Sequence, residues 1–192
     1  MVTRELAAVA DAVAKARVAL PVPLGIVWQA LANVPDPEIP VVSVVELGIV
    51  RGIERDERDA SLLIVRVTPT YSGCPATELI VASICEALVD VGVARVRIEI
   101  ELSPPWTTDW IAPAAKEKLR AFGIAPPVGA ARVAMPIDVT GITPLRRAAV
   151  VVPCPRCGGK RTELLAQFGS TACKAQYRCT DCLEPFDYFK PH

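Results

Sequence analysis

The cysteines constrain the fold of this chain most strongly, because four of them form two Cys-x-x-Cys motifs near its end. Cys154-Pro155-Arg156-Cys157 is followed, after 21 residues, by Cys179-Thr180-Asp181-Cys182. Each motif turns two thiolates toward one point, and four thiolates at tetrahedral positions suit Zn²⁺. Iron and a redox-active dithiol are the alternatives. We expect one structural zinc ion, since a site of four cysteines leaves no open position on the metal; its ligands would be Cys154, Cys157, Cys179 and Cys182.

Residues 150–192 are expected to fold as a zinc ribbon around this site. So short a segment has too small a core to be stable alone, so metal binding would supply much of its folding energy. A ribbon that binds nucleic acid should carry a basic stripe. This one has six Lys and Arg against four Asp and Glu, and four thiolates on Zn²⁺ would bring it near neutrality. Docking to another protein is favoured instead, with aromatic anchors at Tyr177, Phe186, Tyr188 and Phe189.

The balance of charge in the whole chain also restricts the function. With 21 Lys and Arg against 21 Asp and Glu, the chain does not resemble a protein that works on nucleic acid or an anionic membrane. No segment approaches the roughly 20 apolar residues of a membrane span. Charged residues interrupt the N-terminal segment, so we expect no signal peptide. We therefore expect a cytoplasmic protein with reduced thiols, in which clustered cysteines indicate metal more than disulfides.

The periodicity of apolar residues predicts a small α/β sandwich ahead of the ribbon. Helices are expected over residues 3–20, 24–34, 75–91 and 108–122, and strands over 47–54, 60–68 and 95–102. Helices and one mixed sheet in the order α-β-β-α-β-α, followed by a zinc ribbon, place the chain in the α+β class. The expected organisation is an N-terminal helical extension (1–23), an α/β domain (24–125), a linker rich in Pro and Gly (126–149) and the ribbon (150–192).

The residues also predict four details of the sandwich. The prolines of residues 35–40 should prevent a regular element there. The five charged residues 55–59 are typical of a solvated hairpin loop. The helix over 75–91 should bury an apolar face that includes Leu79, and the strand over 95–102 should bury one face that includes Ile100 and Leu102.

Cys74 is the cysteine most suited to chemistry outside the ribbon. It precedes Pro75, which suits the first position of a helix, so Cys74 is expected to be the N-cap. A thiol there would face unpaired amide groups and the positive end of the helix dipole, and both favour the thiolate. Cys74 is therefore a candidate ligand or nucleophile, with a buried structural cysteine as the alternative. The only histidine is His192, the last residue of the sequence, so a histidine base for Cys–His catalysis is not expected. Metal or cluster handling therefore fits Cys74 better.

Other candidates for the same site come from two turns. Asp36, Glu38 and Glu46 could face the crevice of Cys74, or could act only as caps and solvated turn residues. Cys173, near the turn of the ribbon, is either a small packed residue or a surface thiol that handles metal, with Lys174 beside it to favour the thiolate. Cys85 lies on the flank of an apolar helix face and is expected to belong to the core.

Several ordered motifs resemble a known family. They are Asp36-Pro37-Glu38-Ile39-Pro40, Glu46-Leu47-Gly48-Ile49-Val50, Thr68 to Pro75, and Ser103-Pro104-Pro105-Trp106-Thr107-Thr108-Asp109-Trp110. These resemble the iron–sulfur carrier and assembly domain of SufT-type bacterial proteins and of the eukaryotic cytosolic iron–sulfur targeting factor. With the segment Phe168 to Ala175 and the two Cys-x-x-Cys motifs, residues 25–190 resemble the family of D subunits of phenylacetyl-CoA epoxidase systems.

The resemblance implies a role in phenylacetate catabolism as an accessory, non-catalytic protein of the ring-1,2-epoxidase. Such a protein would help assemble or maintain an iron–sulfur or di-iron centre, and its partners would be epoxidase components and the iron–sulfur assembly machinery. The reactive cysteine of the family falls on Cys74, and its acidic turn falls on Asp36 and Glu38. Besides zinc, a transient iron–sulfur cluster or iron is implied. A docking subunit and a nucleic-acid-binding ribbon are the alternatives, and homo-oligomerisation is left open.

The residues agree that this chain is not the epoxidase's catalytic machinery. A di-iron oxygenase needs Glu and His ligands inside a helix bundle, whereas this sequence has one histidine and no Glu-x-x-His motif. It also lacks the Gly-x-Gly-x-x-Gly fingerprint of a dinucleotide-binding reductase.

Overall fold

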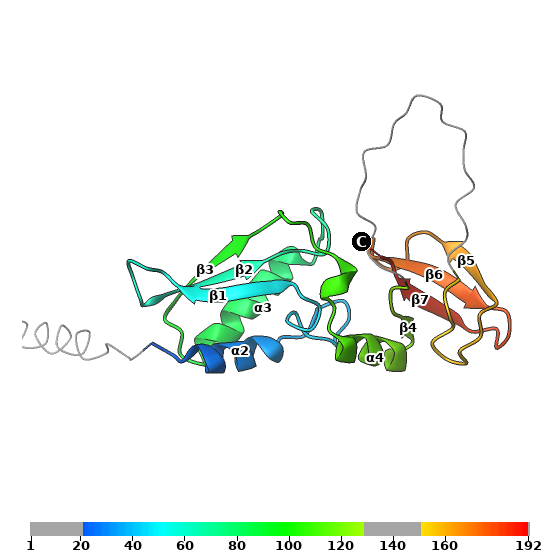
Figure 1. Ribbon diagram of the computed structural model, residues 1–192, viewed down its shortest axis with the longest axis horizontal. Helices are drawn as coiled ribbons and strands as arrows, with labels where there is room; N and C mark the ends of the chain where they lie inside the picture. Colours follow the sequence, from blue (N-terminus) through cyan, green and yellow to red (C-terminus); the bar gives the residue numbers. More distant parts are fainter. Residues whose placement is uncertain (1–20, 129–150, 192) are drawn as a thin grey trace, which may run out of the picture.

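The computed structural model describes residues 21–128 and 151–191, which form two small sheets and several helices (Figure 1). The expected helix over residues 3–20 and most of the expected linker lie outside these residues. The elements are α2 (Leu24–Ala32), β1 (Val50–Arg55), β2 (Leu62–Val67), α3 (Thr77–Asp90), β3 (Arg95–Ile100), the 3-10 helix η1 (Thr108–Trp110), α4 (Pro113–Phe122), β4 (Ile124–Ala125), β5 (Thr162–Ala166), β6 (Lys174–Cys179) and β7 (Pro185–Phe189). None of these helices is long and apolar enough to span a membrane.

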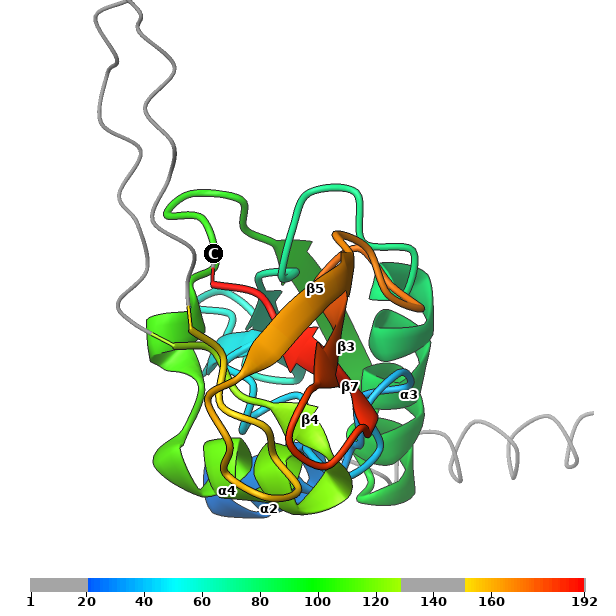
Figure 2. The ribbon, with the colours of Figure 1, turned by 90° about the vertical axis from the view of Figure 1, so that its right-hand side faces the viewer.

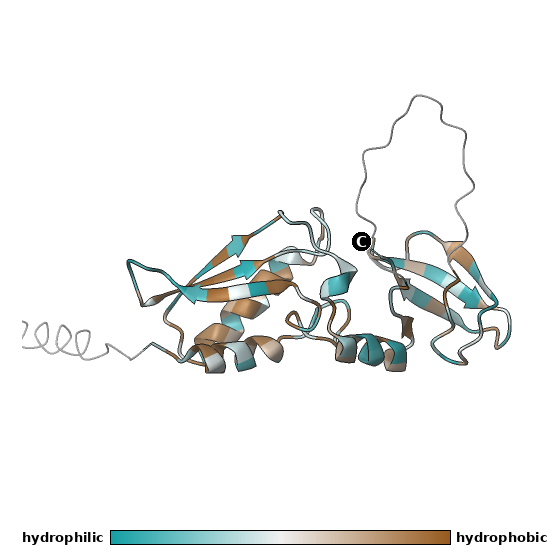
Figure 3. Cartoon of the chain, viewed as in Figure 1, coloured by the Kyte–Doolittle hydropathy of each residue, from teal (hydrophilic) through white to brown (hydrophobic). Residues whose placement is uncertain are grey.

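The first sheet has the strand order β1-β2-β3, and it is mixed as expected. β1 and β2 run antiparallel, whereas β2 and β3 run parallel and are connected through α3. One face of β2 is fully buried through Leu63, Val65 and Val67, which pack in one core with residues of α2 and α3. On the other face Arg66 pairs with Glu54 at 3.0 Å and Glu101 at 3.7 Å. Figure 3 shows hydrophilic and hydrophobic residues alternating along the strands of this sheet.

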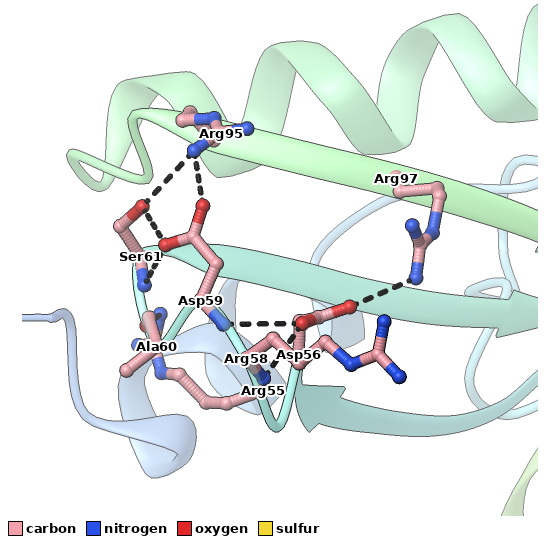
Figure 4. Close-up of polar contacts among 8 residues, drawn as sticks. All are labelled: Arg55, Asp56, Arg58, Asp59, Ala60, Ser61, Arg95 and Arg97. Carbon is pink, nitrogen blue, oxygen red and sulfur yellow. Dashed lines mark hydrogen bonds and ion pairs between the residues drawn. The ribbon is translucent and has the colours of Figure 1, made fainter.

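The charged loop between β1 and β2 is tied to the next strand, beyond what a solvated hairpin loop requires (Figure 4). Asp56 accepts backbone hydrogen bonds from Arg58 and Asp59 and pairs with Arg97 of β3 at 3.2 Å. Asp59 pairs with Arg95 of the same strand. The backbone N–H of Arg58 is the largest influence lowering the pKa of Asp56, and the Ser61 hydroxyl is the largest one lowering the pKa of Asp59.

The second sheet has the order β4-β7-β6-β5 and forms the ribbon, the name used here for residues 151–191 together with the sheet that they build. β5, β6 and β7 are antiparallel neighbours, and β4 joins the sheet in parallel with β7. β4 follows α4 directly, so the helix runs into the ribbon sheet. Figure 2 views the molecule from the side of this sheet.

Several boundaries differ from those expected. Residues 33–49 contain turns, as the prolines indicate, but the turns continue past residue 47 and β1 begins only at Val50. Gly48 has φ +70°, and a Cβ there would lie 2.7 Å from Cβ of Trp110. The helix expected over 108–122 is broken before Pro113, since a residue that precedes proline is driven out of the helical region.

Two expectations of burial were wrong. Leu79 on α3 is 61% exposed, while Ile80, Ile84 and Leu88 form the buried stripe of that helix. Ile100, the last residue of β3, and Leu102, which lies beyond the end of that strand, are exposed as well.

Candidate functional site

The acidic turn after α2 forms the first wall of a recess that lies between the α/β domain and the ribbon. Asp36 Oδ1 accepts hydrogen bonds from the backbone N–H groups of Glu38 and Ile39, both at 2.9 Å. These bonds fix the turn that the prolines begin, and they leave Asp36 only 7% exposed. Burial raises the pKa of Asp36 above its ordinary value of 3.8, although these two N–H groups and the nearby Lys174 act in the opposite direction.

The loop between β2 and α3 forms the second wall and carries Cys74. The Cys74 N–H donates to the carbonyl of Tyr71 at 3.1 Å, and the Cys74 carbonyl accepts from the Thr77 hydroxyl at 2.8 Å. The expected N-cap was wrong, because α3 begins at Thr77 with Ala76 as its cap. The backbone carbonyl of Cys74 therefore receives the first donors of the helix, and its half-buried thiol lines the recess.

The ribbon supplies the third wall through the turn between β5 and β6. Cys173 in this turn is 5% exposed and belongs to the same hydrophobic core as α3 and the acidic turn. A surface thiol, one of the two roles considered for it, is thus excluded. Its sulfur lies 3.0 Å from Thr171 Oγ1. Burial raises the pKa of the Cys173 thiol, and this outweighs the opposing effects of Thr171 and Lys174.

These walls bring four sequence-predicted residues into one recess: Asp36, Glu38, Cys74 and Cys173. The recess measures about 330 Å³ with its open mouth, and its remaining lining is mainly apolar, including Ile39, Leu47 and Phe189. Cys173 therefore meets Cys74 across the recess although the two are far apart in the sequence. Glu46 does not join them, because it binds the backbone of Ser43 and pairs with Lys118 at 2.7 Å.

The electrostatics of the recess combine the buried carboxylate of Asp36 and the half-buried one of Glu38 with a buried cation. Lys174 is almost fully buried and pairs with Asp187 at 3.3 Å, and its charge lowers the pKa of Asp36 and Glu38. Burial and the neighbouring Asp36 nevertheless raise the pKa of Glu38. Asp36, Glu38 and the Cys173 thiol all have raised pKa values in the protein alone. Together with the Cys74 thiol they are suited to a cation, which would stabilise their charged forms.

We expect the Asp36→Asn substitution to raise the stability of the protein at neutral pH. Asparagine can still accept the two N–H bonds through Oδ1, while the buried charge is lost. The folded-state pKa of Asp36 is raised above 3.8, the value expected in the unfolded chain. At pH values between the two, the Asp36 carboxyl is therefore more protonated in the folded protein than in the unfolded one. The gain should therefore shrink as pH falls through the raised pKa and vanish below 3.8. Urea unfolding of both proteins at each pH would check this, and a constant difference would contradict it.

Sequence reasoning missed the role of the ribbon aromatics. Phe186, Tyr188 and Phe189 were expected to be anchors for another protein, but all three are buried within this chain. Phe189, 1% exposed, packs at 6.0 Å from Trp106 between ring centroids and lines the recess. The signal available in the sequence was the alternation in β7, which places Phe189 and Asp187 on one side of the strand.

The second candidate site is the group of four ribbon cysteines. Their sulfurs all lie within 4.8 Å of one another, and within residues 21–128 and 151–191 this is the one such group of three or more metal-ligating residue types. Cys154 Sγ lies 3.8 Å from Cys182 Sγ, and Cys157 Sγ lies 3.6 Å from Cys179 Sγ. In a tetrahedral centre with Zn–S bonds of about 2.3 Å, the sulfurs would be about 3.8 Å apart. The four thiols therefore fit one zinc ion.

The turn after the first motif is also shaped for a metal. Gly158 has φ +74°, and the Gly159 N–H points at Cys157 Sγ at 3.4 Å. A Cβ on Gly159 would lie 2.4 Å from Asp181 Oδ2 and 3.2 Å from Cys157 Sγ. Both glycines let the backbone wrap closely around the sulfurs. In the second motif, the backbone N–H of Cys182 is the largest influence lowering the pKa of Cys179 to about 7.

Comparison with family models defines the class of protein. Residues 26–100 match the family described as "Iron-sulfur cluster assembly protein", and residues 140–190 match "PaaD zinc beta ribbon domain". The chain thus joins a domain of the iron–sulfur cluster assembly class to a zinc ribbon.

Individual relatives specify the family. The chain is 44% identical over 165 residues to the putative D subunit of 1,2-phenylacetyl-CoA epoxidase of Escherichia coli (strain K12), a match that covers 85% of this chain and 90% of that protein. The chain belongs to the family of this D subunit. It is also 38% identical over 88 residues to "Fe-S protein maturation auxiliary factor YitW" of Bacillus subtilis (strain 168), covering 45% of this chain and 83% of that protein. A solved structure, the conserved hypothetical protein TM0487 from Thermotoga maritima, is 34% identical with a TM-score of 0.43, covering 52% of this chain and 95% of that one.

Proposed function

We propose that this protein is a non-catalytic accessory factor that helps assemble or maintain a metal centre, iron–sulfur or di-iron, of the phenylacetyl-CoA ring-1,2-epoxidase. Its partners would be epoxidase components and the iron–sulfur assembly machinery. The observation that carries the proposal is the recess that gathers Cys74, Asp36 and Glu38. The names of the two relatives, an epoxidase subunit and an iron–sulfur maturation factor, support the same role.

The chemistry of the recess favours metal handling over catalysis by a nucleophilic cysteine. A catalytic thiol needs a general base within hydrogen-bond reach, and the residues described by the structure include no histidine. Thiols and carboxylates are instead ligands for iron and related ions. In this role Cys74 would bind the metal, and Asp36 and Glu38 would assist its capture and release.

We further propose that the four ribbon cysteines hold one structural zinc ion. The ion would fix the turns that begin β5 and end β6, and so would hold the ribbon in the shape that presents Cys173. This zinc is distinct from the metal that the recess would pass on.

A deletion strain tests the proposed function. Without this protein the epoxidase should be expressed but poor in iron, and wild-type protein should restore its iron content. The Cys74→Ser variant should fail to restore it, with a loss of at least tenfold in epoxidase activity, while Cys85→Ser should restore it fully. Iron in the purified epoxidase components is the measurement. A fully metallated, active epoxidase from the deletion strain would contradict the proposal. Full rescue by Cys74→Ser would instead favour a role for this protein as a docking subunit.

A further inference from the structure

The recess presents a second thiol that the ribbon brings to it. Cys173 and Cys74 lie on opposite walls, one in the ribbon and one in the α/β domain. Each thiol affects the ionisation of Tyr71, whose pKa is raised by burial and then by the charges of Cys74, Cys173 and Glu38. A site built by the α/β domain alone would have a single thiol, whereas this chain offers two thiols and two carboxylates.

The recess is also narrow. Without its open mouth, the cavity measures only about 10 Å³, which is room for about one water molecule or one ion. An iron–sulfur cluster, with several metal and sulfide atoms, is far larger. In the arrangement described here the recess fits a single metal ion between its walls.

The charges around the recess point to a cation as well. Asp36 and Glu38 line the recess, Asp187 pairs with Lys174 beside it, and Lys174 and Lys190 are the nearby cations. Lys174 is held by Asp187, and Lys190 Nζ donates to the carbonyl of Gln167 and lies over the Phe168 ring. Both ammonium groups are thus engaged beside the recess, and ionisation of the two thiols would leave a clear excess of negative charge for a divalent ion.

We propose that Cys173 is the second thiol ligand of this site, opposite Cys74, and that the metal is held there as a single thiophilic divalent ion such as Fe²⁺. This inference rests on the proposed function and specifies its cargo. The carboxylates of Asp36 and Glu38 would complete the ligand set. The ligand atoms of the recess do not converge as tightly as those of the ribbon cysteines, so binding would draw the ribbon turn toward Cys74 and strengthen the contact between the two domains.

Anaerobic titration with Co²⁺ tests the inference on the full chain with zinc in its ribbon. Wild-type protein should take up one Co²⁺ per chain while it keeps its zinc, with a sulfur-to-cobalt charge-transfer band and a rise in melting temperature. Cys173→Ser and Cys173→Ala should bind Co²⁺ at least tenfold more weakly and lose part of the band. Cys85→Ser should behave as wild type. Zinc content and the melting temperature without cobalt show that each variant is folded.

The outcomes separate this inference from the proposed function. Binding of Co²⁺ by both Cys173 variants with wild-type affinity would overturn the role of Cys173. Uptake of two or more irons with matching sulfide per chain, dependent on both thiols, would overturn the single ion in favour of a cluster. Either result leaves the test of epoxidase iron in cells unaffected, because that test depends on Cys74 and not on Cys173.

Discussion

Replacing Cys154 by serine should abolish the zinc binding that we propose for the ribbon and should unfold the ribbon, which is the largest effect expected from any single substitution in this chain. Structural zinc contributes an apparent binding free energy of about 10–16 kcal/mol in small zinc domains. Cys154 is buried in the small second core with Val152, Cys179 and Phe186, so little else would hold these residues once the metal is lost. Cys182→Ser should have the same effect, since its sulfur faces Cys154 at 3.8 Å.

Metal analysis and amide NMR spectra would measure this outcome. Wild-type protein should contain one zinc per chain, and the variants should contain none and lose the dispersed signals of β5 to β7, whereas the signals of β1 to β3 should remain. Cys85→Ser on α3 is the control, because it removes a cysteine without touching the ribbon. Purified wild-type protein with iron or no metal in the ribbon would contradict the assignment of zinc.

The second large effect is expected from Phe189→Ala. Phe189 is 1% exposed and joins the ribbon to the core of the α/β domain beside Trp106. Truncation of a buried phenylalanine costs about 3–5 kcal/mol, and here the cavity would open at the contact between the ribbon and the α/β domain. The ribbon should keep its zinc, whose ligands are elsewhere, but should separate from the α/β domain more often.

Alkylation of Cys173 under native conditions reports this separation. Cys173 is buried in the wild-type protein, so its reaction with a thiol reagent should be slow and should become much faster in Phe189→Ala. Phe168→Ala is a matched control, because Phe168 is an aromatic residue of the same ribbon that is 65% exposed. Equal protection of Cys173 in Phe189→Ala and wild type would show that Phe189 does not hold the ribbon in place.

Local chemistry made much of this structure predictable from the sequence. The spacing of Cys154, Cys157, Cys179 and Cys182 predicted one convergent metal site, because each Cys-x-x-Cys turn fixes the direction of its two thiols over a few bonds. Alternation and helical periodicity predicted the order of helices and strands. The turn at Asp36 was equally local, since prolines and an aspartate that caps its own turn act within three residues.

Long-range packing decided what the sequence did not predict. Nothing near Cys173 in the sequence indicates that its thiol is buried and lines the same recess as Cys74, because the ribbon brings Cys173 into the core of the α/β domain. Leu79 fits a helical apolar stripe but is exposed, because the face of α3 that packs in the core is the one with Ile80, Ile84 and Leu88. The break before Pro113 is an exception, because its cause is local: proline restricts the backbone of Ala112 and so ends the expected helix there.

The pairing of β4 with β7 has a consequence for how the chain is held together. Ile124 and Ala125 precede residues 129–150, yet they already lie opposite Asp187 and Tyr188 in the parallel pairing of β4 with β7 near the end of the chain. The contact between the two domains therefore does not depend on the peptide that connects them. We expect a protein cut within residues 129–150 to stay together as a nicked complex. We also expect two separately produced fragments, one ending after β4 and one beginning near Val151, to associate in solution.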